Sequence, residues 1–217
     1  MRVLFAGTPE IALPSLRLLH EHGYISAVLS SPDAPKGRSK RLVPSPVKEL
    51  ALELGLPVLT PSRLGREARE EIRPLEADLL AVVAYGKIFG PKFLELFPRG
   101  GVNLHPSLLP KFRGPAPLPA TILAGEKEWG LSVQQIALEM DAGDIYTQRR
   151  FPLQGTETAA ELASRAAEEG AEALLETVRM IEAGEAQADP QNEAEASFFG
   201  LIRKNDGEID WTLSATE

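Results

Sequence analysis

Short apolar runs alternate with amphipathic segments along the first half of the chain. Residues 3–6 (VLFA) and 25–29 (ISAVL) are predicted strands, and the amphipathic residues 9–23 between them are a predicted helix. Residues 78–85 (DLLAVVAY) form the most apolar run, which predicts a central strand buried on both faces. Strands separated by helices are typical of βαβ units. The pattern therefore predicts an α/β protein with a Rossmann-like, mostly parallel, doubly wound sheet and helices on both faces.

The second half continues with three predicted strands and a long helical segment. Residues 101–105 (GVNLH) are one strand, and residues 130–137 and 145–151 are two more. The last two are separated by the turn MDAGD at residues 140–144. Residues 158–183 are rich in Ala, Glu and Leu, which predicts one or two helices.

Composition places the chain among ordinary soluble proteins. Of its 217 residues, 43% are apolar and 25% are charged. The absence of cysteine excludes disulfides, thiolate nucleophiles and cysteine-ligated zinc. The chain runs directly into its first predicted strand and contains no apolar run near the length of a membrane span, so we expect a cytoplasmic protein without membrane contact. No exposed apolar stripe is evident, which favours a monomer.

Charge is distributed unevenly along the chain. The net charge of −8 argues against a general nucleic-acid-binding surface. Between Asp33 and Lys48, however, there are five bases and one acid, a local balance of +4. Proline, glycine and serine make residues 31–44 a predicted loop, and residues 45–55 are a predicted helix. A charged loop of this kind is usually a solvated surface, and the alternative is a local contact with phosphate.

Two polar side chains share one face of the predicted strand 101–105. Asn103 and His105 are two residues apart, and His105 lies at the carboxyl end of the strand, where open α/β sheets place reactive groups. A carboxamide can donate to a developing oxyanion and an imidazole can move a proton, which suits acyl transfer. The alternative is that both side chains only satisfy backbone groups at the strand end. The other histidines, His20 and His22, lie at the polar end of a predicted helix and are interpreted as solvated.

Residues 103–114 (NLHPSLLPKFRG) resemble the signature of the folate-dependent formyltransferases. A second landmark of that family is an aspartate in a glycine-containing turn, about three dozen residues after the histidine. Asp141, in the turn 140–144, occupies that position. The resemblance covers essentially the whole chain, and it implies that Asn103, His105 and Asp141 are catalytic.

Within the family, the chain is most similar to the members that formylate methionyl-tRNA. The matching segments are FAGTPE at 5–10, KGRSKRLVPSPVKELA at 36–51, VVAYG at 82–86, GPAP at 114–117 and IDWTLS at 209–214. The resemblance implies transfer of the formyl group of 10-formyltetrahydrofolate to the α-amine of initiator methionyl-tRNA, for translation initiation. It also implies that the basic loop binds tRNA through Lys36, Arg38, Lys40 and Arg41.

The same resemblance implies a division of the chain. Members of this branch continue into a C-terminal OB-like barrel that helps to hold tRNA, and only the approach to it is recognisable here. Periodicity weakens after residue 184, and Leu213 begins a helical pattern that is too short to finish. We therefore expect a formyltransferase catalytic domain over residues 1–184, and a linker with the start of a truncated C-terminal domain over residues 185–217.

A folate site is implied between three turns, at residues 85–89, 107–110 and 141–144. The residues expected to hold folate are Tyr85, Lys87, Ile88, Phe89, Ser107, Leu108, Leu109, Pro110 and Asp144. Backbone groups would read the pterin ring and apolar side chains would cover it. Asn103 and protonated His105 would stabilise negative charge on the formyl oxygen. Asp141 would orient His105 and help a proton to reach the leaving folate nitrogen, whereas Asp144 is interpreted as structural.

Other enzyme classes match the sequence less well. A nicotinamide-dependent dehydrogenase would need further glycines after Gly7, a serine hydrolase would need a Gly-x-Ser-x-Gly turn, and the chain offers no metal ligand set. Within the family, two kinds of enzyme would share the catalytic residues. These are formyltransferases for another amine, on a sugar nucleotide or glycinamide ribonucleotide, and formylfolate hydrolases. We expect them to lack the basic loop, so its presence favours the tRNA enzyme.

Overall fold

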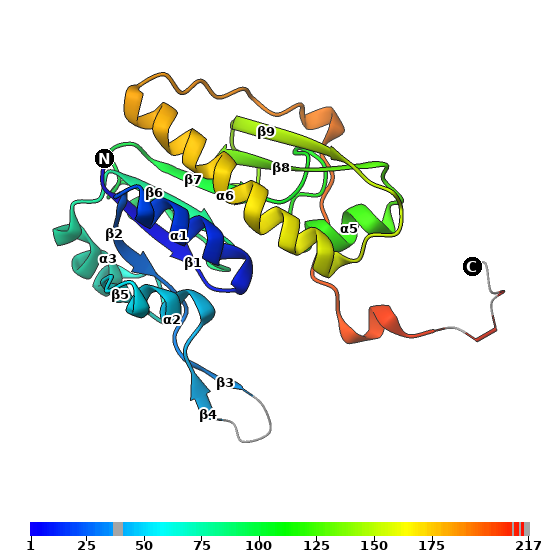
Figure 1. Cartoon of the computed structure of the whole chain (residues 1–217), viewed down its shortest axis with the longest axis horizontal. Coiled ribbons are helices and arrows are strands. Elements are labelled where there is room, and N and C mark those ends of the chain that lie inside the picture. Colours follow the sequence, from blue (N-terminus) through cyan, green and yellow to red (C-terminus); the bar gives the residue numbers. More distant parts are fainter. Residues whose placement is uncertain (37–40, 210, 213, 215–217) are drawn as a thin grey trace.

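The computed structural model describes residues 1–36, 41–209, 211, 212 and 214. Seven strands form a single central sheet in the order β5-β2-β1-β6-β7-β8-β9 (Figure 1). The strands are β1 Val3–Gly7, β2 Ile25–Leu29, β5 Val58–Leu59, β6 Leu79–Val83, β7 Gly101–His105, β8 Glu128–Gln135 and β9 Ile145–Pro152. The pairings are parallel from β5 to β7, and β8 and β9 are antiparallel additions at one edge. This architecture confirms the predicted mostly parallel sheet.

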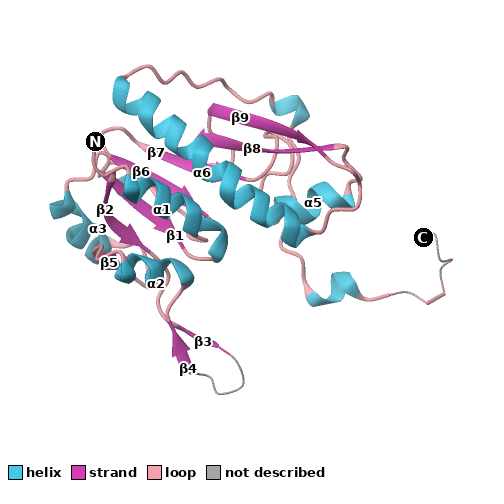
Figure 2. Cartoon of the chain, in the orientation of Figure 1, coloured by secondary structure: helices cyan, strands magenta, loops and turns pink. Residues whose placement is uncertain are grey.

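Helices cover both faces of the sheet (Figure 2). They are α1 Leu13–Glu21, α2 Pro46–Glu53, α3 Arg66–Ile72, α4 Pro91–Leu94, α5 Pro117–Leu123 and α6 Ala159–Ala183, with short 3-10 turns at Glu10–Ala12, Arg73–Leu75, Glu193–Glu195 and Lys204–Gly207. Helices α1, α2 and α6 share one buried apolar cluster with the sheet, and α3 and α4 belong to the cluster on the other face. In the part of the chain that the structure describes, no helix is both long and apolar enough to cross a membrane.

The long segment predicted as one or two helices is a single helix, α6. It begins with a capping box, in which the Thr158 side chain accepts from the Glu161 backbone while the Glu161 carboxylate accepts from Thr158. It ends at Gly184, whose φ of 73° is the left-handed conformation that terminates helices. Gly170, in the middle of α6, allows close packing, because a Cβ there would lie 2.5 Å from a methyl group of Leu104 on β7. Helix α6 is therefore seated directly on the strand that carries Asn103 and His105.

Other predictions need correction. Residues 31–44 were a predicted loop, but they contain a two-stranded hairpin, β3 Ala34–Lys36 and β4 Arg41–Val43. Its strands lack the alternation of apolar and polar residues that marks a half-buried strand, because the hairpin projects from the body of the molecule (Figure 1). The predicted helix 9–23 is shorter, since α1 begins at Leu13 after a 3-10 turn. No pattern predicted α3 or α5, which are short and are rich in charge and in proline, respectively.

The two faces of the sheet are covered unequally, and this difference leaves one face of β7 free of helices in the described part of the chain. Val102 and Leu104 point into the cluster that contains α6. Alternation along the strand therefore turns Asn103 and His105 to the opposite face. On that face, the buried strand residues of the apolar cluster come from β1, β2 and β6, so among the described residues α3 and α4 do not extend over β7 to β9. The fold thus presents two polar side chains on a sheet face that only loops can cover.

Candidate active site

A cleft of about 670 Å³ opens where β6 and β7 end. Chain order along the sheet reverses between β1 and β6, and ligands of open α/β folds bind beside such a reversal, at the carboxyl ends of the strands. The cleft is lined by residues 82–89, 103–106, 114–119 and 134–141, with Ile11 and Ala166. It brings together seven of the predicted site residues: Tyr85, Lys87, Ile88, Phe89, Asn103, His105 and Asp141.

Asn103, His105 and Asp141 converge on one carboxylate oxygen. The Asn103 amide nitrogen lies 3.4 Å from Asp141 Oδ1, and His105 Nδ1 lies 3.6 Å from the same oxygen. The first contact is a long hydrogen bond, and the second is within ion-pair range but longer than a hydrogen bond. The side chains of His105 and Asp141 are only 6% and 12% exposed. Three polar groups far apart in the sequence therefore form a compact cluster that is largely shielded from solvent.

Hydrogen bonds from two other segments hold the Asp141 carboxylate. Gln134 on β8 donates its amide N–H to Oδ1 at 3.0 Å, and the backbone N–H of Gly114 donates to Oδ2 at 2.8 Å. Asp141 itself has a φ of 55°, in the left-handed region that non-glycine residues rarely adopt. Gly143, two residues on, approaches β8 so closely that a Cβ would lie 1.9 Å from the carbonyl oxygen of Gln135. The turn is thus fastened to β8 by side chain and backbone alike.

The imidazole of His105 is oriented at both nitrogens. Its Nε2 lies 2.9 Å from the carbonyl oxygen of Phe112, which can only accept, so this nitrogen carries a hydrogen. Its Nδ1 faces Asp141. Both ring nitrogens thus face oxygen atoms, which fixes the orientation of the ring. Phe112 also has a left-handed backbone, with a φ of 59°. Strained residues of this kind cluster at functional sites, where the surroundings hold them in place.

An aromatic ladder supports the opposite wall of the cleft. Tyr85 stacks on Phe89 with ring centroids 5.5 Å apart, and Phe89 contacts Phe93. The Tyr85 side chain is buried, and its hydroxyl has no hydrogen-bond partner among the described residues, so burial raises the pKa of Tyr85 to about 12. The Lys87 ammonium lies over the Tyr85 ring and donates to the carbonyl of Pro61, and burial lowers the pKa of Lys87. This wall is packed and mainly apolar.

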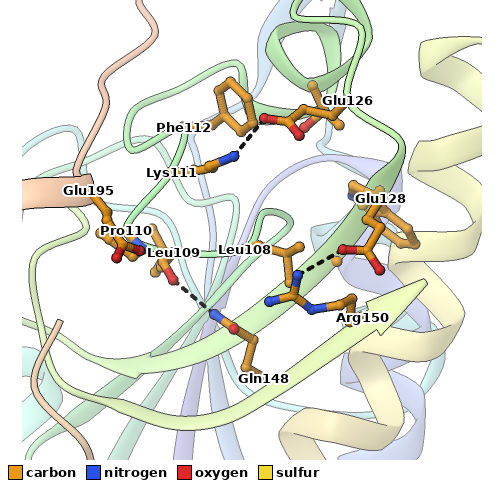
Figure 3. A pocket seen from close by; sticks show the side chains of 13 residues that line it. Leu108, Leu109, Pro110, Lys111, Phe112, Glu126, Glu128, Gln148, Arg150 and Glu195 are labelled. Atoms are coloured by element: carbon orange, nitrogen blue, oxygen red, sulfur yellow. Dashed lines mark hydrogen bonds and ion pairs between the residues drawn. The ribbon is translucent and has the colours of Figure 1, made fainter. Parts of the chain in front are cut away.

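Five predicted folate-binding residues lie elsewhere. Leu108, Leu109 and Pro110 line a separate pocket of about 280 Å³, together with Lys111, Gln148 and Arg150 (Figure 3). The Ser107 hydroxyl donates to the carbonyl of Lys111. The backbone carbonyl of Asp144 accepts from the N–H of Gln135, and Asp144 is absent from the lining of the cleft.

Side chains of β8 and β9 draw this loop away from the cleft. The Ser132 hydroxyl accepts from the Leu109 N–H, and the Gln148 amide donates to the Leu109 carbonyl. The structure therefore places this loop against β8 and β9, outside the lining of the cleft.

Sequence reasoning missed two glutamines at the cluster. Gln134 is 1% exposed, and a polar residue inside the apolar predicted strand 130–137 was a usable signal for it. Gln191 donates to the backbone carbonyls of Asp141 and Gly143 at 2.8 and 2.7 Å. No pattern in the sequence around Gln191 indicates this contact.

The predicted tRNA-binding residues are only partly described. Arg41 is exposed on β4, and Lys36 is the last residue of β3, with its backbone paired to Arg41. Arg38 and Lys40 lie outside the described residues. No group of three or more His, Cys, Asp or Glu side chains in the described part of the chain could hold a metal ion.

Comparison with known proteins identifies the family. The family model described as "Formyl transferase" matches residues 1–178. The chain belongs to the formyl transferase family. A methionyl-tRNA formyltransferase of Treponema denticola is 43% identical to this chain, and the alignment covers 100% of the chain and 70% of the relative. One from Symbiobacterium thermophilum is 44% identical over 100% of the chain and 67% of its own length.

Solved structures of other formyl transferases share the fold. The N-formyltransferase of Helicobacter canadensis, in complex with folinic acid and dTDP-3-aminofucose, superposes with a TM-score of 0.73 at 21% identity, covering 98% of this chain and 76% of that one. Glycinamide ribonucleotide transformylase 1 of Symbiobacterium toebii gives a TM-score of 0.72 at 20% identity, covering 88% of this chain and 94% of that one. At these identities the likeness concerns the fold alone.

The buried Tyr85 hydroxyl predicts an alkaline dependence of stability. Its pKa is about 12 in the folded chain and about 10 when unfolded, so the unfolded chain loses the proton first as the pH rises. The wild type therefore loses stability between pH 10 and 12, by up to about 2 kcal/mol from this group. Tyr85→Phe should match or slightly exceed the wild type at pH 7 and should lack this loss. Urea unfolding of both proteins at pH 7, 10 and 11.5 measures it, and parallel pH profiles would contradict it.

Proposed function

We propose that this chain transfers the formyl group of 10-formyltetrahydrofolate to the α-amine of initiator methionyl-tRNA, for translation initiation. The observation that carries the proposal is the convergence of Asn103, His105 and Asp141 at the floor of a cleft. Relatives named methionyl-tRNA formyltransferase, which align with essentially the whole chain at 38–44% identity, support this acceptor. The names of these relatives specify the acceptor of the formyl group, which is methionyl-tRNA.

The dimensions and lining of the cleft suit a folate. Its volume of about 670 Å³ lies within the range of small-molecule sites, and its walls are mainly apolar. Ile88, Leu138 and Met140 stand at its border with 76%, 68% and 47% of their surfaces exposed, so a planar ring between them would bury apolar area. Backbone groups of residues 82–89 and 136–141 would fix the polar edge of that ring. A bound 10-formyltetrahydrofolate would supply the activated formyl group.

Asn103 is placed to stabilise the charge that develops on the formyl oxygen. Its amide makes one long hydrogen bond, at 3.4 Å, so the group can donate more strongly to a new negative charge. His105 would donate to the same oxygen from a protonated Nδ1, which lies 3.6 Å from Asp141, beyond hydrogen-bond distance. The two side chains leave the same face of β7, which allows both to reach one reacting atom.

Asp141 would orient the His105 ring and balance the positive charge on it. The acceptor nitrogen must lose a proton as its bond to the formyl carbon forms, and the folate nitrogen must gain one as its bond to that carbon breaks. The His105–Asp141 pair, linked directly or through water, would move this proton. The chain's own contribution is thus positioning, charge stabilisation and proton transfer.

Formyl transfer assayed with several acceptors tests the proposal. The full chain and 10-formyltetrahydrofolate should formylate methionyl-tRNA. Uncharged tRNA, an amino sugar nucleotide and glycinamide ribonucleotide should give no product, and hydrolysis without acceptor should be slow. Transfer to the sugar nucleotide or to glycinamide ribonucleotide instead would assign the chain to another branch of the family. Rapid hydrolysis without acceptor would assign it as a formylfolate hydrolase.

Substitution of the catalytic cluster separates chemistry from binding. His105→Ala and Asp141→Asn should each lower kcat by about 100-fold or more, since each removes charge stabilisation or proton transfer. Titration calorimetry should give nearly unchanged affinity for 5-formyltetrahydrofolate, because the walls of the cleft remain. His22→Ala, at an exposed histidine, is the matched control. Wild-type kcat in either variant would remove that residue from the mechanism.

The β3–β4 hairpin is the proposed tRNA contact. It projects from the body of the molecule beside α2 and carries Arg41 on its exposed surface (Figure 1). Its segment has a local charge of +4 on an acidic chain, so it forms the most basic part of the molecule and suits a phosphate backbone.

Loss of one hairpin charge should weaken tRNA binding specifically. Arg41→Leu should raise the KM for methionyl-tRNA by about tenfold, equivalent to one charge-assisted hydrogen bond of about 1.5 kcal/mol, and reduce the salt slope by about 1. The kcat and the folate affinity should not change. Arg66→Leu, which removes an exposed arginine from α3, is the control. An unchanged KM and salt slope for Arg41→Leu would exclude this arginine from the tRNA contact.

A further inference from the structure

The segment that follows α6 returns across the molecule to the catalytic cluster. It runs beside β9 and then descends past the loop before α5 (orange in Figure 1). Asp189 and Ile145 exchange backbone hydrogen bonds of 2.8 and 3.0 Å, and Arg113 pairs with Ser197 and Phe199 at 2.8 Å each. Residues 189–199 are therefore bound at both ends, and the site lies between the two anchors.

Gln191 connects this segment to the catalytic turn. Its amide nitrogen lies 2.8 Å from the Asp141 carbonyl, 2.7 Å from the Gly143 carbonyl and 3.2 Å from Gln134 Oε1. Its carbonyl oxygen accepts from Arg113 at 2.8 and 3.1 Å. A single side chain thus contacts the backbone of Asp141, the backbone of Gly143 and the glutamine that donates to the Asp141 carboxylate.

Arg113 fixes Gln191 in this orientation. The Arg113 residue is only 5% exposed, and its guanidinium forms a pair of hydrogen bonds with the Glu193 carboxylate at 2.6 and 3.0 Å. A buried guanidinium is stable only when its donors are satisfied, and Gln191 and Glu193 accept four hydrogen bonds from it. The orientation of the Gln191 amide then follows, because its oxygen must face the guanidinium and its N–H groups must face the catalytic turn.

The same segment supports the other side of the cluster. Ser197 accepts the Arg113 N–H and, through its hydroxyl, the Phe112 N–H at 2.9 Å. Residues 112–114 also provide the carbonyl that binds His105 and the N–H that binds the Asp141 carboxylate. Two left-handed residues, Phe112 and Asp141, are therefore held from outside by one stretch of chain.

We propose that Gln191 is a positioning residue for formyl transfer, and that residues 189–199 complete the active site by holding the Asp141 turn against His105 and Asn103. The proposal rests on the catalytic role proposed above for Asp141. Gln191 lies outside residues 1–178, which the family model matches. It touches the turn through backbone carbonyls, so its effect on the reaction is transmitted by geometry alone.

Gln191→Leu tests the proposal, because leucine keeps much of the volume of the glutamine side chain and removes all of its side-chain hydrogen bonds. The kcat for methionyl-tRNA should fall by about 10- to 100-fold, as expected when a catalytic group loses its support. The affinity for 5-formyltetrahydrofolate should change by less than about threefold, since the wall at residues 82–89 is untouched. Amide hydrogen exchange of the peptide over residues 139–144 should accelerate. Gln187→Leu, on the exposed part of the same segment, should change none of these values.

A double-mutant cycle distinguishes positioning from general destabilisation. In the Asp141→Asn background, Gln191→Leu should lower kcat by no more than about twofold further, because its effect passes through Asp141. Three outcomes would each overturn the positioning role. The first is a double variant whose loss of kcat is the product of the two single losses, and the second is unaltered hydrogen exchange in Gln191→Leu. The third is wild-type kcat in Gln191→Leu when Asp141→Asn is inactive. Wild-type kcat of Asp141→Asn would instead refute the proposed function of that residue, and the two failures are thereby separable.

Discussion

The Asp141 carboxylate is the acceptor on which three separate parts of the chain converge. Asn103 approaches it from β7, Gln134 from β8 and the Gly114 N–H from the loop before α5. A carboxylate that is 12% exposed has lost most of its water, so these donors replace the hydrogen bonds that water would make. The relative positions of β7, β8 and the loop therefore determine whether these hydrogen bonds can form. The cleft, the His105 ring and the segment after α6 all lie around this one group.

Unequal cover of the sheet makes such a group possible. On one face, α1, α2 and α6 form a continuous apolar layer with the strands. On the other face, α3 and α4 cover β1, β2 and β6, and β7 to β9 are left to loops. Loops supply backbone donors and acceptors that a covering helix would use internally. The polar cluster therefore lies between the sheet, whose other face carries the apolar layer, and loops whose backbone groups form hydrogen bonds with it.

The fold class and the clustering of Asn103, His105 and Asp141 were predictable because their signals are local. Asn103 and His105 are two residues apart on one strand, and Asp141 lies in a turn with a recognisable glycine. Alternation of apolar runs predicted the parallel strands. Ser107–Pro110 lie outside the lining of the cleft, because Ser132 and Gln148 bind Leu109, and the positions of these two side chains depend on the pairing of β8 with β9. Gln191 could not be predicted either, since its partners are about 50 residues away and its neighbours in sequence have no periodicity.

The close approach of Gly143 to β8 has a consequence for motion. Because the Gly143 Cα lies against the Gln135 carbonyl with no room for a side chain, the turn and the strand cannot slide past each other. Central strands are among the stiffest parts of a protein, whereas free turns fluctuate on nanosecond timescales. We therefore expect the Asp141 carboxylate to move with the sheet and to share the small amplitude of its thermal motion. An apparently flexible loop residue thus keeps the positional precision of a core strand.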